Sequence, residues 1–364
     1  MSTRPLSQRV EALVRPEIRA LSAYHVPPAA GLLKLDAMEN PYQWPDPLKR
    51  QWLDTLNEVS INRYPEPGAE AVKAGLRQVM GVADDYEVLL GNGSDEIIQL
   101  LALAVTAPGR SILAPEPSFV MYRMIGTFVG MEYIGVPLGD NFELDLEAML
   151  AAVKTHQPAL IFLAQPNNPT GNLFEEAKVR AIIEAADGLV VLDEAYTAFT
   201  DTDSLPLLDE YDNLVVMRTL SKVGLAGLRL GLLIGKPEWL GELDKLRLPY
   251  NINVLTQASA VFALQHFDVL KAQTRQLRQD RELMVEMLRQ IPALAVWPSE
   301  ANFVLVRTPA GRARDIFEAL KLRGILIKVL DGSHPALADC LRLTVGSSAE
   351  NARLLEELAA ILDS

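Results

Sequence analysis

Short apolar runs alternate with longer amphipathic runs through the central part of the chain, and this alternation limits the fold more than any other feature. Runs of strand length occupy residues 86–90, 111–114, 159–163, 189–192, 214–217 and 230–234, and helices are expected over 95–105, 119–128 and 175–186. Apolar strands separated by helices are typical of a mostly parallel sheet that is buried on both faces. The sequence therefore predicts an α/β fold with a three-layer αβα domain.

The pattern changes near Pro249, where a smaller α+β domain is expected to begin. A long helical region covers about 256–290, strand-like segments follow at 303–307, 325–329 and 341–345, and helices are expected at 312–323 and 349–362. A chain of 364 residues is too long for one ordinary core. We predict an N-terminal arm over residues 1–45, a large domain over 46–250 and a small domain over 251–364.

Composition argues against several classes of partner. With 34 basic and 47 acidic residues the formal net charge is −13, and a chain without a basic block is poorly suited to binding nucleic acid or an anionic membrane. No apolar stretch approaches the roughly 18 residues of a membrane helix, and the charged N-terminus is not typical of a secretory signal. The single cysteine, Cys340, fits a reducing compartment, and the four scattered histidines lack metal-ligand spacing. We expect a cytoplasmic protein that binds no nucleic acid, membrane or metal.

The first of four polar segments, GNGSDE, follows the predicted strand 86–90 and opens a helix. Its glycines, Gly91 and Gly93, let the backbone approach an anion closely, and the helix N-terminus offers free N–H groups. Ser94 adds a hydroxyl. The alternative is a Ser or Asp cap on an ordinary helix. Glu96 stands where a dinucleotide-binding fingerprint has its third glycine, so the segment does not match that fingerprint.

Two further segments follow the next buried strands. Asn168, in QPNNPTG, is a polar amide held at a strand end by a neighbouring proline, although an ordinary loop would look similar. Asp193 begins DEAY at the end of strand 189–192, and a buried carboxylate needs a partner such as a protonated ring nitrogen. Tyr196 could donate to an oxygen of the same ring. The alternative for Asp193 is a cap on a following helix.

The fourth segment, RTLSKVGLAGLR, places Lys222 between hydroxyl side chains and glycines after a strand. A desolvated, neutral lysine amine can attack a carbonyl and form a Schiff base. Arg229 can hold a phosphate through two hydrogen bonds. A single lysine is usually a solvated surface residue, and the order of all four segments at strand ends favours the catalytic interpretation.

In order and approximate spacing, GNGSDE, NNPTG, DEAY and TLSK followed by GLRLG resemble segments of the fold-type I aminotransferases that depend on pyridoxal 5'-phosphate (PLP). Within that family the chain is most similar to the histidinol-phosphate aminotransferases, through NRYP at 62–65, PYNIN at 249–253, ANF at 301–303 and LRLTVG at 341–346. The resemblance covers essentially the whole chain.

The resemblance implies a role for each matching residue. Lys222 carries PLP, Asp193 pairs with its pyridine nitrogen, and Asn168 and Tyr196 contact its phenolic oxygen; Lys222, Asp193 and Tyr196 are the catalytic residues. The residues expected around the cofactor phosphate are Gly93, Ser94, Asp95, Thr219, Ser221 and Arg229. Phe119 is expected to stack on the ring.

The resemblance also implies a homodimer with shared active sites, because Tyr64 would reach the cofactor phosphate of the neighbouring subunit. The residues expected to contact substrate are Tyr24, Asn40, Lys328 and Arg342, with Arg342 as the anion-binding arginine. The expected substrates are histidinol phosphate, glutamate and 2-oxoglutarate.

Three positions depart from the family pattern. Phe119 replaces a frequent tyrosine, which keeps the stacking and loses a hydroxyl. The interval from Lys222 to Arg229 is one residue shorter than usual, so this loop is expected to take another path. Lys328 stands where the family usually has arginine, and an ammonium is a point charge rather than a two-pronged donor.

Other functions remain to be weighed against this one. An aromatic aminotransferase or a threonine-phosphate decarboxylase of the same fold is the nearest alternative. A transcription regulator with an aminotransferase-like domain would need a helix-turn-helix region, which an arm of roughly 45 residues cannot hold. The missing third glycine and the better explanation of Lys222 argue against a dehydrogenase.

Overall fold

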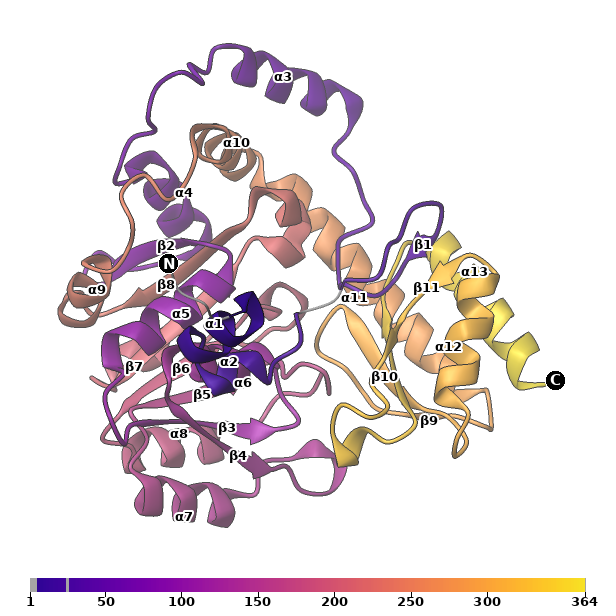
Figure 1. The fold of residues 1–364 in the computed structure, drawn as a ribbon. Helices are drawn as coiled ribbons and strands as arrows, with labels where there is room; N and C mark the ends of the chain where they lie inside the picture. Colours follow the sequence, from indigo (N-terminus) through magenta and orange to yellow (C-terminus); the bar gives the residue numbers. More distant parts are fainter. Residues whose placement is uncertain (1–4, 24–25, 364) are drawn as a thin grey trace.

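The computed structural model describes residues 5–23 and 26–363, and its centre is a seven-stranded sheet (Figure 1). The strands are β2 (Glu87–Asn92), β3 (Ser111–Glu116), β4 (Glu132–Pro137), β5 (Leu160–Ala164), β6 (Leu189–Asp193), β7 (Leu214–Thr219) and β8 (Leu230–Gly235). Their order is β2-β8-β7-β6-β5-β3-β4, and all pairs are parallel except those of β8, which runs antiparallel to β2 and β7. The predicted mostly parallel sheet is therefore confirmed.

Every residue of strands β5 to β8 is buried, which explains why they are continuous apolar runs in the sequence. Successive side chains of each strand enter different cores: Val191 packs with one group of helices, and Val190 and Leu192 pack with the other. Strand β4 was not predicted, because this edge strand mixes exposed Glu132 and Pro137 with partly buried residues.

Helices cover both faces of the sheet. One face carries α5 (Ser94–Val105), α6 (Met121–Val129) and α9 (Pro237–Asp244). The other carries α4 (Glu70–Met80), α7 (Leu146–His156), α8 (Glu176–Ala185) and α10 (Val254–Gln265). The three layers of the predicted αβα architecture are present.

A four-stranded antiparallel sheet follows, seen in yellow in Figure 1 beside the larger sheet. Its order is β12 (Lys328–Val329), β13 (Cys340–Thr344), β10 (Phe303–Arg307) and β9 (Ala295–Val296), and α11 (Phe267–Arg289), α12 (Ala313–Leu322) and α13 (Ser348–Leu362) pack against it. Helix α11 joins the two parts, since Leu270 enters the core of the larger sheet and Leu277 that of the smaller one.

Two expected elements are divided. The helical region 256–290 is two helices, because the backbone of His266 (φ −115°, ψ 29°) leaves the helical conformation between α10 and α11. The expected strand 325–329 is β11 (Ile325–Leu326) and β12, which belong to different sheets. Strand β11 pairs in parallel with β1 (Leu33–Lys34), so the N-terminal segment lies against the C-terminal part of the chain.

The remaining helices are short or peripheral. They are α1 (Leu6–Leu13), α2 (Pro16–Arg19) and α3 (Asp46–Asn57), the 3₁₀ turns η1 (Asp140–Phe142), η2 (Thr197–Phe199), η3 (Leu205–Asp209), η5 (Ala226–Leu228) and η6 (Pro335–Leu337), and the π-helical turn η4 (Ser221–Leu225). Across residues 5–23 and 26–363, none of the helices combines the length and apolar character that a membrane crossing requires. The domain boundaries at 45 and 250 stay a prediction. Helix α10 follows residue 250 in the sequence, and it buries Ala260 and Leu264 in the core of the larger sheet.

Candidate active site

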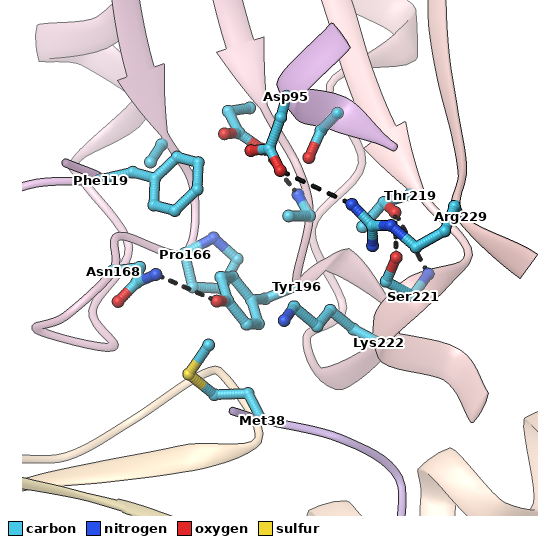
Figure 2. Close-up of a pocket in the computed structure, with 14 residues that line it drawn as sticks. Met38, Asp95, Phe119, Pro166, Asn168, Tyr196, Thr219, Ser221, Lys222 and Arg229 are labelled. Atoms are coloured by element: carbon cyan, nitrogen blue, oxygen red, sulfur yellow. Dashed lines mark hydrogen bonds and ion pairs between the residues drawn. The ribbon is translucent and has the colours of Figure 1, made fainter. Parts of the chain in front are cut away.

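The predicted polar residues meet at one edge of the seven-stranded sheet, where β2, β5, β6 and β7 end. Because β8 runs the other way, Arg229, which precedes it, lies at the same edge. A pocket opens here (Figure 2), lined by Met38, Ser94, Asp95, Phe119, Ala164, Pro166, Asn168, Asp193, Ala195, Tyr196, Thr219, Ser221, Lys222 and Arg229. Only Met38, Ala164, Pro166 and Ala195 were not predicted as site residues.

Lys222 projects into this pocket from the π-helical turn η4. Its Nζ donates a 3.2 Å hydrogen bond to the carbonyl oxygen of Ala37 and lies 5.6 Å from the centroid of the Tyr196 ring. Burial, followed by the positive charge of Arg342, lowers the pKa of Lys222 to about 8. The amine is therefore mostly protonated at pH 7, but it becomes neutral and nucleophilic at a much lower pH than an ordinary lysine.

Asp193 ends β6, and its side chain is buried. Its Oδ2 accepts a 2.6 Å hydrogen bond from the Tyr122 hydroxyl, and its Oδ1 accepts one of 3.1 Å from the backbone N–H of Ala195. Burial raises the pKa of Asp193 to about 6, while these two donors oppose the rise. The carboxylate is therefore largely ionised at pH 7 and suited to a cationic partner.

Asn168 links two other side chains of the site. Its Nδ2 donates to the Tyr196 hydroxyl at 3.2 Å, and its Oδ1 accepts a 2.6 Å hydrogen bond from Nη1 of Arg342. Burial raises the pKa of Tyr196 well above its ordinary value, so its phenol keeps its proton. The buried Arg342 comes from β13, so this chain of hydrogen bonds crosses between the two sheets.

The N-terminus of α5 and Arg229 form the opposite end of the pocket. Gly93 has a φ of 83°, and a Cβ atom there would lie 2.6 Å from Nη2 of Arg229, so the guanidinium crosses directly over the glycine. The N-cap of α5, Gly93, makes no side-chain cap hydrogen bond, and the first helical residues, Ser94 and Asp95, line the pocket. Arg229 also lies 3.6 Å from Asp95, and the hydroxyls of Thr219 and Ser221 are 3.0 Å apart. The guanidinium, the hydroxyls and the helix N-terminus could together hold a small anion.

The loop from Lys222 to Arg229 consists of two short turns, and its path relative to other family members stays a prediction. The π-helical turn η4 passes directly into the 3₁₀ turn η5, with Gly224 at a φ of 119°. Arg229 itself is left-handed, with a φ of 50°, before β8 begins. The two turns bring both cations to the same pocket.

A family comparison decides what this arrangement belongs to. The model of the family described as aminotransferase class I and II matches residues 30–358. This chain belongs to the class I and II aminotransferases.

The aminotransferase is similar over nearly its whole length to named relatives. It is 54% identical to histidinol-phosphate aminotransferase 2 of Nitrosococcus oceani, over 97% of this chain and 98% of that one. It is 52% identical to the histidinol-phosphate aminotransferase of Chromobacterium violaceum, over 96% and 98%. The crystal structure of histidinol-phosphate aminotransferase from Sinorhizobium meliloti, in complex with pyridoxal-5'-phosphate, has a TM-score of 0.84 at 27% identity and covers 96% of each chain.

Several predicted residues of the aminotransferase lie outside the pocket lining. Asn40 donates to the carbonyl oxygen of Val223 at 3.1 Å, beside Lys222. Lys328 is paired in register with Arg342, and burial lowers the pKa of its amine. Tyr64 is 79% exposed and stacks on Tyr250 with 4.5 Å between ring centroids.

Tyr24 lies outside the described residues. Besides Ala164, Pro166 and Ala195, three residues that shape the aminotransferase site were not predicted. Met38 has a left-handed backbone (φ 54°), fixed by bonds to Thr344 and Asn302, and no local pattern marks it. Ala37 contributes only a carbonyl group. Tyr122 follows Phe119 by three residues, and this spacing was the one available signal.

Proposed function

We propose that this aminotransferase binds PLP and catalyses the reversible transfer of an amino group from histidinol phosphate to 2-oxoglutarate, which gives imidazole-acetol phosphate and glutamate in histidine biosynthesis. The single observation that carries the proposal is that one pocket contains Lys222, Asp193 and a group of residues suited to hold an anion. Relatives that match nearly the whole chain at 52–54% identity are named histidinol-phosphate aminotransferases.

The side chains of the pocket fit PLP. Lys222 offers a partly neutral amine for the cofactor's aldehyde, and Asp193 offers a buried carboxylate for a protonated ring nitrogen. Ser94, the hydroxyl of Ser221 and Arg229, with the N-terminus of α5, would hold the phosphate. Phe119 lines the pocket as a flat apolar surface for the ring.

When bound, PLP supplies an electron sink that stabilises negative charge on the substrate carbon. Lys222 is the base, because its amine has a lowered pKa and can accept the proton from the carbon that bears the amino group. Tyr196, whose phenol keeps its proton and is oriented by Asn168, would donate a hydrogen bond to the phenolic oxygen of bound PLP. These groups are fixed before substrate arrives, so little reorganisation is needed.

Substrate recognition is assigned to the cations of β12 and β13. Glutamate has a carboxylate and histidinol phosphate has a phosphate in the corresponding role, so one site must accept both anions. Arg342 supports this role because its guanidinium is buried and bonded to Asn168, which lines the pocket. Lys328 lies opposite Arg342 in the sheet and adds a second positive charge.

We also propose that the enzyme is a homodimer in which Tyr64 completes the site of the partner. Tyr64 and Ile61 are more than three-quarters exposed, and Leu248 is nearly so, which leaves these apolar side chains accessible to a partner subunit. A cytoplasmic location stays a prediction. The stacking of Tyr64 on Tyr250 supports an ordered presentation of this surface.

An assay of purified enzyme tests the substrate assignment. Histidinol phosphate, phenylalanine and threonine phosphate are each supplied with 2-oxoglutarate, and glutamate formation and carbon dioxide release are measured. The proposal expects the highest kcat/KM for histidinol phosphate and no carbon dioxide. A higher kcat/KM for phenylalanine, or carbon dioxide from threonine phosphate, would assign one of the alternative activities.

A further inference from the structure

Tyr122 is fully buried beneath the active site and does not line its pocket. Its hydroxyl donates the 2.6 Å hydrogen bond to Oδ2 of Asp193. Its ring stacks on Phe162, with centroids 4.4 Å apart and 8° between the planes, and meets Phe119 edge to face at 5.6 Å. One side chain on α6 therefore contacts both groups that would flank the cofactor ring, the carboxylate and the aromatic surface.

The hydrogen bond to Asp193 matters because the buried carboxylate is not solvated by water. Burial favours the neutral acid, and the nearby carboxylates of Asp95 and Glu194 favour it further. The Tyr122 hydroxyl and the Ala195 N–H act in the opposite direction. The Ala195 donor is part of the backbone and persists in any variant, so Tyr122 is the donor whose contribution can be removed.

The packing around Tyr122 fixes where its hydroxyl points. The stack on Phe162 and the edge contact with Phe119 hold the ring within the core, and burial raises the pKa of Tyr122 well above its ordinary value. The hydroxyl therefore keeps its proton and acts only as a donor toward Asp193. A short bond from a fixed donor to a carboxylate is of the charge-assisted kind, which is stronger than a neutral one.

We propose that Tyr122 is a positioning residue of this aminotransferase, which fixes the Asp193 carboxylate, keeps it anionic for the cofactor's ring nitrogen and aligns Phe119 against the same ring. This inference rests on the proposed use of PLP. It concerns a residue that contacts neither substrate nor cofactor, so its effect must pass through Asp193 and Phe119.

The test compares Tyr122→Phe with a matched control, Tyr86→Phe. Tyr86 is also a buried tyrosine whose hydroxyl donates to an aspartate, Asp209, and neither residue lines the pocket. Each holoenzyme is prepared with PLP labelled with ¹⁵N in the ring, and its ¹⁵N NMR signal is followed from pH 6 to pH 9. Cofactor dissociation is measured separately by equilibrium dialysis.

In the wild type and in Tyr86→Phe the ring nitrogen is expected to stay protonated through this range. In Tyr122→Phe its signal should move toward that of the unprotonated ring as the pH rises. The dissociation constant for PLP should increase roughly tenfold to a hundredfold, the effect of one charge-assisted hydrogen bond. Unchanged ¹⁵N signals and unchanged affinity in Tyr122→Phe would overturn the proposal.

A double variant separates a role through Asp193 from general damage to the core. In an Asp193→Asn background, adding Tyr122→Phe should change cofactor affinity far less than it does in the wild type. Equal losses in both backgrounds would overturn the role through Asp193. Failure of the wild-type protein to bind PLP at all would contradict the proposed function instead, so the two failures are distinguishable.

Discussion

Nη1 of Arg342 lies 2.6 Å from Oδ1 of Asn168, and this hydrogen bond ties the four-stranded sheet to the pocket edge of the seven-stranded sheet. Asn168 extends this link to a third side chain, because its Nδ2 donates a hydrogen bond to the Tyr196 hydroxyl. An anion that engages Arg342 therefore acts on a side chain two hydrogen bonds from Tyr196. Substrate recognition and cofactor orientation are linked through one amide.

Arg342→Ala is expected to slow both half-reactions, since glutamate and histidinol phosphate would share its guanidinium. One charge-assisted contact contributes about 1.5–3 kcal/mol, so the loss should be roughly tenfold to a hundredfold. Lys328→Ala should slow the histidinol-phosphate half-reaction more than the glutamate one, and Lys328→Arg should be tolerated. Single-turnover kinetics of each half-reaction measures this. A small and equal effect of Lys328→Ala on both would show that Arg342 acts without it.

The amine of Lys222 should titrate well below an ordinary lysine. Its pKa of about 8, against an ordinary 10.5, means that the apoenzyme amine is protonated and unreactive below pH 8 and becomes nucleophilic above it. Labelling with a small amine-reactive reagent, read by mass spectrometry against the exposed Lys245, should show a half-maximal rate near pH 8. In Arg342→Ala the midpoint should rise, because a neighbouring positive charge has been removed. A wild-type midpoint near 10.5 would contradict the assignment.

Borohydride should attach the cofactor permanently to Lys222. The holoenzyme is expected to absorb in the visible range, to lose this band on reduction and to yield one labelled peptide that contains Ser221 and Lys222. Lys222→Ala is the control and should yield no such peptide. Label on another lysine would remove Lys222 from its proposed role.

Shared sites predict complementation between inactive variants. Mixed subunits of Lys222→Ala and Tyr64→Ala should regain part of the activity, because one of the two sites in a heterodimer would have both residues intact. Subunit exchange is verified with differently tagged chains. Absence of activity despite proven exchange would mean that Tyr64 does not act across a dimer interface.

Gly231→Ala should weaken cofactor binding. A Cβ at Gly231 would lie 2.5 Å from the backbone carbon of Gly93 and 2.6 Å from the Ser94 nitrogen, so the turn that opens α5 must move. Gly241→Ala is the control, because nothing lies within 4 Å of its Cβ and alanine favours the helix α9 by about 1 kcal/mol. The expected result is a raised dissociation constant for PLP in Gly231→Ala alone, measured by dialysis.

Much of the site could be predicted because strand ends are marked in the sequence. Asp193 and Asn168 each follow a continuous apolar run, and the parallel sheet brings such positions to one edge. Local patterns carried no information on Met38, whose conformation depends on Thr344, more than 300 positions away. Tyr122 was missed because a buried aromatic residue that holds a carboxylate has the same apolar surroundings as one that only packs.

The sequence also left open which sheet a short apolar run joins. The segment 325–329 was expected as one strand, but its first half pairs with β1 and its second half with β13. Both halves satisfy the same apolar pattern, so only the position of the N-terminal segment divides them. The break at His266 is similar, since residues on both sides favour a helix.

The parallel pair of β1 and β11 fixes the order in which the protein can be completed during translation. Leu33 and Lys34 leave the ribosome early, but their partners Ile325 and Leu326 are made almost three hundred residues later. The adjoining carbonyl of Ala37 and side chain of Met38 therefore cannot take their final positions while the strands of the large sheet are being synthesised. The nascent chain acquires the wall of its pocket last, so cofactor capture in its final geometry follows the synthesis of nearly the whole chain.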